Sequence, residues 1–228
     1  MNPHHYNALN NLGAICKVQH RPEEALAYLQ QAVSIKADSF DVYNNLAAVY
    51  QQLNQFEQAL MYYDQAILLE PGHASVRWNR STVLLMLGRL KEGWEAFEWR
   101  RSAGHWQALP FPEWQGEALQ DKTLLVLAEQ GLGDEILFGS CLPELIKLSK
   151  HCIIECDTRL GDLYRTSFPE ATIKAVVRQQ RDWLKDLSSV DVCIPLGSIS
   201  RFLRKNLTDF PNMSTSIHIK QFALFCGR

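Results

Sequence analysis

The chain of 228 residues has little that would direct it to nucleic acid or to a membrane. Its formal net charge is −2, from 23 basic and 25 acidic residues, so it lacks the positive field that holds polyanions. Its longest apolar runs, such as Leu124–Ala128, are far shorter than the ~18 residues of a transmembrane helix. Met1–Asn10 has neither a basic start nor an apolar stretch, which argues against a secretory signal. We therefore expect a cytoplasmic protein that binds no nucleic acid and spans no membrane.

The sequence also lacks metal-binding spacings. Its six cysteines are scattered, no CxxC pair occurs, and no Cys/His group has the spacing of a zinc site. The nearest two, Cys152 and Cys156, lie in a predicted strand, where they would be ~13 Å apart, too far for a disulfide. We expect free buried thiols and no metal site. The content of 46% apolar and 21% charged residues is that of a folded protein, not a disordered chain.

What the sequence does contain is a repeat with a period of 34 residues. The aligned segments are Asn11-Leu12-Gly13, Asn45-Leu46-Ala47 and Asn79-Arg80-Ser81, with no insertion between them. By period the units are 6–39, 40–73 and 74–107. In the middle unit, small and apolar residues follow the i, i+3, i+4 spacing of a helix face from Tyr43 to Tyr50 and again from Ala59 to Ile67. Each unit is therefore predicted to be a helical hairpin.

This pattern resembles the tetratricopeptide repeat (TPR), which has these residue types at these positions of a 34-residue unit. The resemblance covers residues 6–102, and it implies a solenoid that binds a protein or an extended peptide in its groove. The third unit departs from the pattern, with Arg80, Gly93 and Arg100 where the second has Leu, Ala and Ala. We expect this end to dock onto the part that follows. This unit also contains Trp94 and Trp99, and a plainer alternative is that these two tryptophans are only larger core residues.

An asparagine occupies the same position of all three predicted first helices, as Asn11, Asn45 and Asn79. An amide side chain carries donors and an acceptor, so it can pair with the backbone of a peptide of any sequence. The row resembles the asparagine ladder in the repeat domain of the O-GlcNAc transferase, which implies that these residues bind peptide. The alternative is that they bridge neighbouring repeats, and Asn10 and Asn44, which precede two of them, leave both interpretations open.

Around residue 103 the helical period ends. Residues 103–120 hold two prolines, two tryptophans and two glycines, so they are predicted to be a linker whose aromatic residues Trp106, Phe111 and Trp114 pack onto the next domain. Strand-length apolar runs then alternate with helical segments, which predicts a Rossmann-like parallel sheet. The predicted strands are Lys122–Ala128, Cys152–Cys156, Ala171–Val177 and Asp191–Leu196, and the predicted helices are Glu135–Lys150, Thr158–Thr166 and one that ends near Lys205.

The turn after the first predicted strand, EQGLGD, carries the chemical signal of the second half. Its glycines allow tight backbone geometry, and the N-terminus of the following helix favours an anion. We expect Gln130, Gly131 and Gly133 to form a loop that binds a ligand or acceptor. Asp134 could act as a base for an acceptor hydroxyl, or it could cap the helix. The turn is not a dinucleotide fingerprint, because the third glycine is missing.

The segment from Trp114-Gln115-Gly116 through Lys122–Asp134 resembles the catalytic region of bacterial TPR proteins with a glycosyltransferase-like C-terminal domain. That domain is similar to heptosyltransferases, which have two Rossmann-like halves (the GT-B fold). Gly133-Asp134 matches the Gly-Asp pair that supplies their catalytic Asp. The resemblance implies a nucleotide-sugar donor held mainly by the second half. Residues 121–228 account for the first half alone, so we expect no cofactor in this chain and a donor site in a full-length relative.

The sequence thus predicts an α plus α/β protein with a TPR solenoid over 1–102, a linker over 103–120 and a partial Rossmann-like domain over 121–228. The predicted function is binding of a protein or peptide by the repeats, attached to an incomplete glycosyltransferase-like domain. One alternative is an active glycosyltransferase that moves a sugar to a protein or glycan acceptor, with Asp134 as base. Another is a scaffold that self-associates through its repeats.

Overall fold

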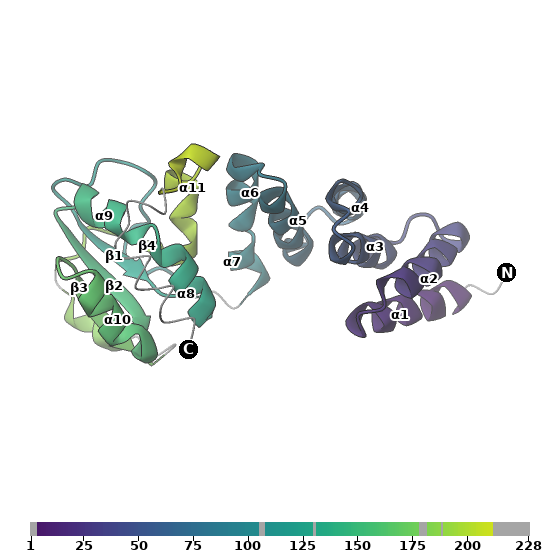
Figure 1. Ribbon diagram of the computed structural model, residues 1–228, viewed down its shortest axis with the longest axis horizontal. Helices are drawn as coiled ribbons and strands as arrows, with labels where there is room; N and C mark the ends of the chain where they lie inside the picture. Colours follow the sequence, from purple (N-terminus) through teal and green to yellow (C-terminus); the bar gives the residue numbers. More distant parts are fainter. Residues whose placement is uncertain (1–3, 105–107, 130, 178–181, 188, 212–228) are drawn as a thin grey trace. The chain divides into compact units, whose positions relative to one another are not determined.

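The computed structural model describes residues 4–104, 108–129, 131–177, 182–187 and 189–211 (Figure 1). The chain divides into two compact units, Met1–Trp106 and Gln107–Arg228. The first unit is helical and the second is built on a parallel sheet. Among the described residues, no helix combines the length and the apolar character that crossing a bilayer requires.

The first unit consists of three helical hairpins. Each first helix packs on its own second helix, and each second helix also contacts the first helix of the next hairpin. The first helices adjoin one another, α1 with α3 and α3 with α5. The helices are α1 (His4–Val18), α2 (Pro22–Ile35), α3 (Phe40–Gln52), α4 (Phe56–Leu69), α5 (Ala74–Met86), α6 (Leu90–Phe97) and the short α7 (Arg100–Ala103). The predicted helical repeat is confirmed.

The same backbone turn joins the two helices of every hairpin. His20, Asn54 and Gly88 are spaced by one period and all have positive φ, at 57°, 58° and 73°. In each turn the next residue donates its N–H back to the first helix, as Arg21 N does to Cys16 O at 2.9 Å. This is the left-handed helix ending that satisfies free carbonyls at a C-terminus.

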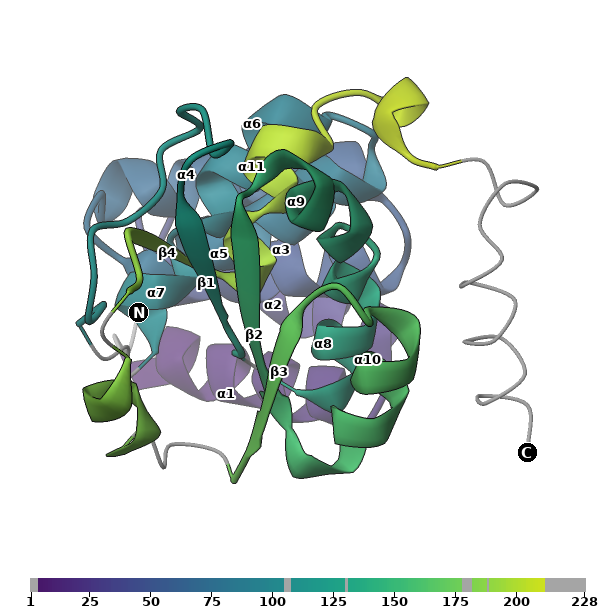
Figure 2. The ribbon, with the colours of Figure 1, turned by 90° about the vertical axis from the view of Figure 1, so that its left-hand side faces the viewer.

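The second unit is organised around four parallel strands in the order β3-β2-β1-β4 (Figure 2). The central β1 is buried along its whole length, as expected for a strand with neighbours on both edges and cover on both faces. The strands are β1 (Thr123–Leu127), β2 (His151–Asp157), β3 (Thr172–Val176) and β4 (Val192–Pro195). Each falls within a residue or so of a predicted run.

The helices of the second unit differ more from the prediction. The segment expected to be one helix over Glu135–Lys150 is two, because Pro143 lies in the first turn of the second helix and could not continue the ladder of the first. The helices are α8 (Leu132–Gly139), α9 (Leu142–Leu148), α10 (Gly161–Ser167) and α11 (Ser200–Leu203). The short 3₁₀ turns are η1 (Thr158–Leu160), η2 (Asp182–Asp186), η3 (Leu196–Ser198) and η4 (Leu207–Asp209).

The Pro- and Trp-rich segment belongs structurally to the second unit. Trp114 N donates to Cys193 O at 2.9 Å, and Cys193 N donates to Pro112 O at 2.8 Å, so residues 112–114 run alongside β4. Phe111 packs in the cluster of buried residues around Leu125. Trp106 lies outside the described residues. Phe111 and Trp114 therefore pack on the second unit, as predicted for the aromatic residues of this segment, and its described residues from 108 onward belong to that unit.

Candidate functional site

The three asparagines of the predicted ladder lie on α1, α3 and α5, the helices that adjoin one another. Asn11 is exposed, whereas Asn45 and Asn79 are half-buried. Within the described part of the chain, no hydrogen bond is formed by the side-chain amides of Asn11 and Asn79. These two amides are therefore available to a ligand.

Asn45 has a different environment, because it joins two repeats. Its Nδ2 donates to Asn10 Oδ1 at 3.0 Å, and its Oδ1 accepts from Lys17 Nζ at 2.8 Å. Burial lowers the pKa of Lys17, whose ammonium group is half-buried at this bond. An amide has two N–H groups and two lone pairs, so Asn45 keeps one of each for a further partner.

A second set of bridges joins α3 to α5 and α4, and sequence reasoning missed it. Gln51 Nε2 donates to Thr82 Oγ1 at 3.1 Å, and Gln51 Oε1 accepts from the Tyr63 hydroxyl at 3.1 Å. Burial raises the pKa of Tyr63, which keeps its hydroxyl protonated as a donor. Gln51 lies one period after Lys17, so a polar residue at this shared position was the available signal.

In the atypical third repeat, ion pairs replace apolar packing. Arg80 donates from Nε to Asp64 Oδ1 at 2.6 Å and from Nη2 to Glu92 Oε1 at 3.2 Å. These bonds join α5 to α4 and α6, where the second repeat has a buried leucine. The Arg77 guanidinium lies 4.7 Å from the centroid of the Trp99 ring. A pocket of about 260 Å³ lies beside these side chains, and its lining residues are Asp64, Ile67, Arg77, Arg80, Ala96 and Trp99.

In the second unit, the helix that carries Asp134 begins earlier than predicted. Gly131 is the residue before α8, and Gly133 and Asp134 lie in its first turn. Asp134 Oδ2 accepts the backbone N–H of Gly131 at 2.9 Å, which is a helix-capping bond. Gln130 lies outside the described residues. Asp134 is half-buried, and its Oδ1 accepts no hydrogen bond among the residues that the structure describes.

Asp134 follows β1, next to β4, where the strand order reverses direction. Open parallel sheets bind ligands at this switch point, outside the carboxyl ends of the strands. At this edge of the sheet, buried carboxylates hold neighbouring segments together, because each accepts a hydrogen bond from a backbone N–H of another segment. The bonds are Gly197 N to Glu129 Oε1 at 2.5 Å, Ala128 N to Glu155 Oε2 at 3.0 Å and Asp157 N to Glu135 Oε2 at 2.9 Å. No group of three or more His, Cys, Asp or Glu among the described residues could hold a metal ion.

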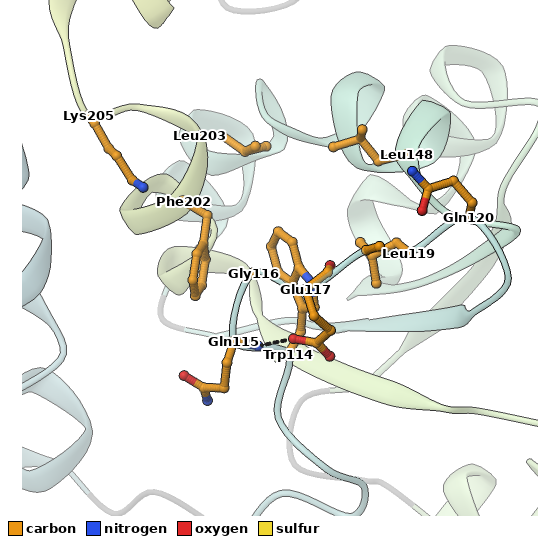
Figure 3. Close-up of a pocket in the computed structure, with 11 residues that line it drawn as sticks. Trp114, Gln115, Gly116, Glu117, Leu119, Gln120, Leu148, Phe202, Leu203 and Lys205 are labelled. Carbon is orange, nitrogen blue, oxygen red and sulfur yellow. Dashed lines mark hydrogen bonds between the residues drawn. The ribbon is translucent and has the colours of Figure 1, made fainter.

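A separate aromatic pocket lies at the opposite edge of the sheet. Figure 3 shows the Trp114 and Phe202 rings, whose centroids are 4.6 Å apart, beside Leu119 and Leu148. The pocket volume is about 410 Å³. Leu119 precedes β1 and Leu148 precedes β2, so the pocket is at the amino ends of these strands. It is therefore distinct from the edge that carries Asp134.

The three helical hairpins identify the protein class of the first unit. Two family models, both described as tetratricopeptide repeat, match residues 4–69 and 44–100. Residues 4–100 are therefore TPR repeats, a helical architecture that serves as a protein-binding module.

Among curated proteins, this chain is similar to Protein FlbA of Caulobacter vibrioides, with 36% identity over 109 residues. The match covers 45% of this chain and 18% of FlbA, so the chain spans less than a fifth of that relative.

Solved TPR structures are also similar. The second TPR of Spaghetti (RPAP3), bound to the HSP90 peptide SRMEEVD, is 22% identical with a TM-score of 0.40, over 42% of this chain and 88% of that one. The Arabidopsis OM64 TPR domain is 20% identical with a TM-score of 0.42, over 43% and 82%. The Yersinia enterocolitica secretion chaperone SycD, in complex with a YopD peptide, is 17% identical with a TM-score of 0.40, over 42% and 73%.

Proposed function

We propose that the repeats bind an extended peptide along the row of first helices α1, α3 and α5. The observation that carries this proposal is the regular placement of amide side chains on three adjoining helices. Asn11 and Asn79 have unengaged amides, and Asn45 keeps one N–H and one lone pair. Each amide can pair with one peptide unit of a bound backbone.

The same chemistry predicts how selective this binding is. Amides that pair with backbone groups do not distinguish side chains, so many sequences would bind with similar affinity. Hydrogen bonds between the first helices, such as those of Asn45 with Asn10 and Lys17, hold the row in place before the peptide arrives. Such preorganisation lowers the entropic cost of binding.

The test uses peptides selected against the full chain from a degenerate 12-residue library. The variant Asn11→Ala/Asn79→Ala should bind them at least tenfold more weakly, since each lost hydrogen bond is worth about 0.5–1.5 kcal/mol. Its thermal stability should be unchanged, because these amides make no bond inside the described fold. The control Gln30→Ala/Gln65→Ala alters exposed amides on the second helices α2 and α4, away from the row, and should bind like the wild type. Equal binding by both variants would refute the role of the row.

A second candidate function rests on the switch point beside Asp134. We propose that the second unit is the acceptor-side half of a glycosyltransferase of GT-B type, in which Asp134 deprotonates an acceptor hydroxyl and the glycines around it approach the substrate. Asp134 Oδ2 is used by the cap, and Oδ1 is the atom that would take the proton. The nucleotide-sugar donor would be held by the second half of a full-length relative.

Asp134→Asn separates the two roles of this carboxylate. An Asn oxygen can still accept the Gly131 N–H, so stability should change by less than about 0.5 kcal/mol, whereas the proton acceptor is lost. Asp134→Ala should lose both the hydrogen bond from Gly131 N and the proton acceptor. The measurement is sugar transfer by a full-length relative that carries the matching residue. Unchanged transfer by the Asn variant would exclude Asp134 as the base. If calorimetry showed that this chain binds a nucleotide-sugar with micromolar affinity, the proposal that the donor site lies in the second half of a full-length relative would be wrong.

A further inference from the structure

The second and third hairpins differ at two positions whose side chains lie next to each other. In the second hairpin these are Tyr43 and Tyr62, whose ring centroids are 5.9 Å apart. One period later the same positions hold Arg77 and Ala96. Both of these residues line the pocket of about 260 Å³ in the third hairpin. The pocket therefore lies where the preceding repeat has an aromatic ring.

The Arg77 guanidinium is held in place with its outer edge unused. Its Nε donates to Pro71 O at 2.7 Å, and the guanidinium lies 4.7 Å from the centroid of the Trp99 ring. Among the residues that the structure describes, Nη1 and Nη2 form no hydrogen bond, and Arg77 pairs with no carboxylate. A planar guanidinium whose two terminal nitrogens are unengaged matches the two oxygens of a carboxylate.

The charges around the pocket favour one negative charge at Arg77. Arg80 pairs with Asp64 and Glu92, and Arg89 also pairs with Glu92. These two cations and two anions balance one another, so the network does not neutralise Arg77. The third repeat as a whole has six Lys or Arg residues and three Glu, whereas the first two repeats together have three basic and seven acidic residues. The third repeat therefore attracts an anion more strongly than the others do.

We propose that this pocket binds an aromatic carboxylate. The carboxylate accepts hydrogen bonds from Nη1 and Nη2 of Arg77, and the ring packs against Ala96 and Trp99. The ring then takes the place that Tyr62 occupies one repeat earlier. This chemistry is found in a free aromatic acid and at the end of a peptide whose last residue is aromatic.

The proposed site is separate from the asparagine row. Arg77 and Asn79 are two positions apart on α5, which places their side chains ~160° apart around the helix. The pocket lies between α5 and residues of α4 and α6, whereas the row follows the side on which α5 adjoins α3. Carboxylate binding by the pocket and peptide binding by the row can therefore fail independently.

Titration of the full chain with phenylacetate tests the proposal, with the indole ¹⁵N–¹H signal of Trp99 as the readout. A ligand of this size binds with a dissociation constant in about the millimolar range. Phenylacetamide, which lacks the charge, and acetate, which lacks the ring, should each bind at least about fivefold more weakly. N-acetylphenylalanine represents a peptide end. Its binding more tightly than phenylacetate would assign the pocket to a peptide terminus, and weaker binding would assign it to a free acid.

Two variants alter the two parts of the site. Arg77→Gln should weaken phenylacetate binding at least about tenfold, because the charged fork is lost. The matched control Arg21→Gln removes an exposed arginine of the first hairpin and should bind like the wild type. Ala96→Tyr restores the residue type of the preceding repeats, so it should fold and should block the pocket.

The comparison of ligands on the wild type keeps the test decisive if a variant fails to fold. A Trp99 signal that does not move up to about 20 mM phenylacetate would overturn the proposal, since this concentration is well above the expected dissociation constant. Equal binding of phenylacetamide and phenylacetate would also overturn it, as would undiminished binding by folded Arg77→Gln or Ala96→Tyr.

Discussion

Glu129 Oε1 accepts a hydrogen bond of 2.5 Å from Gly197 N, which joins the segment after β1 to the turn after β4. The two residues are 68 positions apart in the chain, and Glu129 is 9% exposed. This bond crosses the switch point of the sheet, beside the helix that carries Asp134. It therefore fixes the relative position of two loops at the edge where a ligand of an α/β fold would lie.

The first prediction concerns this bond. Glu129→Ala should lower the free energy of unfolding by about 1–3 kcal/mol, because the buried Gly197 N–H loses its acceptor. Glu129→Gln keeps an acceptor oxygen and should lose less than half as much. Urea denaturation measures both, with the exposed Glu170→Ala as a control expected within about 0.5 kcal/mol of the wild type. Equal losses for Ala and Gln would mean that charge, not the hydrogen bond, is what matters.

The second prediction concerns the turn that each hairpin shares. His20 has a left-handed backbone at φ 57°, where the third repeat has Gly88. His20→Gly should raise the free energy of unfolding by about 0.5–1 kcal/mol, since glycine adopts this conformation without a steric cost. Asn54→Gly should gain less, because asparagine tolerates it better. Gln19→Gly is the control, and it should destabilise. A loss of stability in His20→Gly would contradict the left-handed turn.

The third prediction is a dependence of stability on alkaline pH. Burial raises the pKa of the Cys152 and Cys156 thiols to about 12. In the unfolded chain a thiol ionises near pH ~8.5, so above that pH the unfolded state binds fewer protons than the folded state. The stability that each thiol contributes is complete below pH ~8.5 and falls by about 1.4 kcal/mol per pH unit toward pH 12.

Replacing one of these thiols isolates its share. Between pH 8 and pH 10, wild-type stability should fall by about 2 kcal/mol more than that of Cys152→Ala, because the variant has one fewer group to ionise on unfolding. Urea denaturation at a series of pH values gives the two curves. Parallel curves would show that the Cys152 thiol is not protected by burial.

How far the sequence predicts this protein depends on the range of the interactions. The repeats and strands are local patterns, and the run Cys152–Cys156 lies inside β2 because a parallel strand buried on both faces must be apolar throughout. The division at Pro143 was missed, although proline carries the signal, because the apolar periodicity continues across it.

The features of the candidate sites depend on distant partners. Lys17 and Asn45 are 28 positions apart, and Glu129 and Gly197 are 68 apart. No local pattern specifies which partner a polar side chain finds across that separation. Residue type predicted that the Asn row would form hydrogen bonds. Only the packing of α1 against α3 shows that Asn45 uses one N–H group and one lone pair for hydrogen bonds within the protein.

Side-chain amide resonances test the central claim most directly. The ¹⁵N–¹H signals of the Asn11, Asn45 and Asn79 amides are followed while a library-selected peptide is added to the full chain. The account predicts that all three shift in proportion to the bound fraction, while Asn54, in the turn after α3, stays unchanged. A peptide that binds without moving the signals of Asn11, Asn45 and Asn79 would contradict the proposal that the asparagine row holds the peptide backbone.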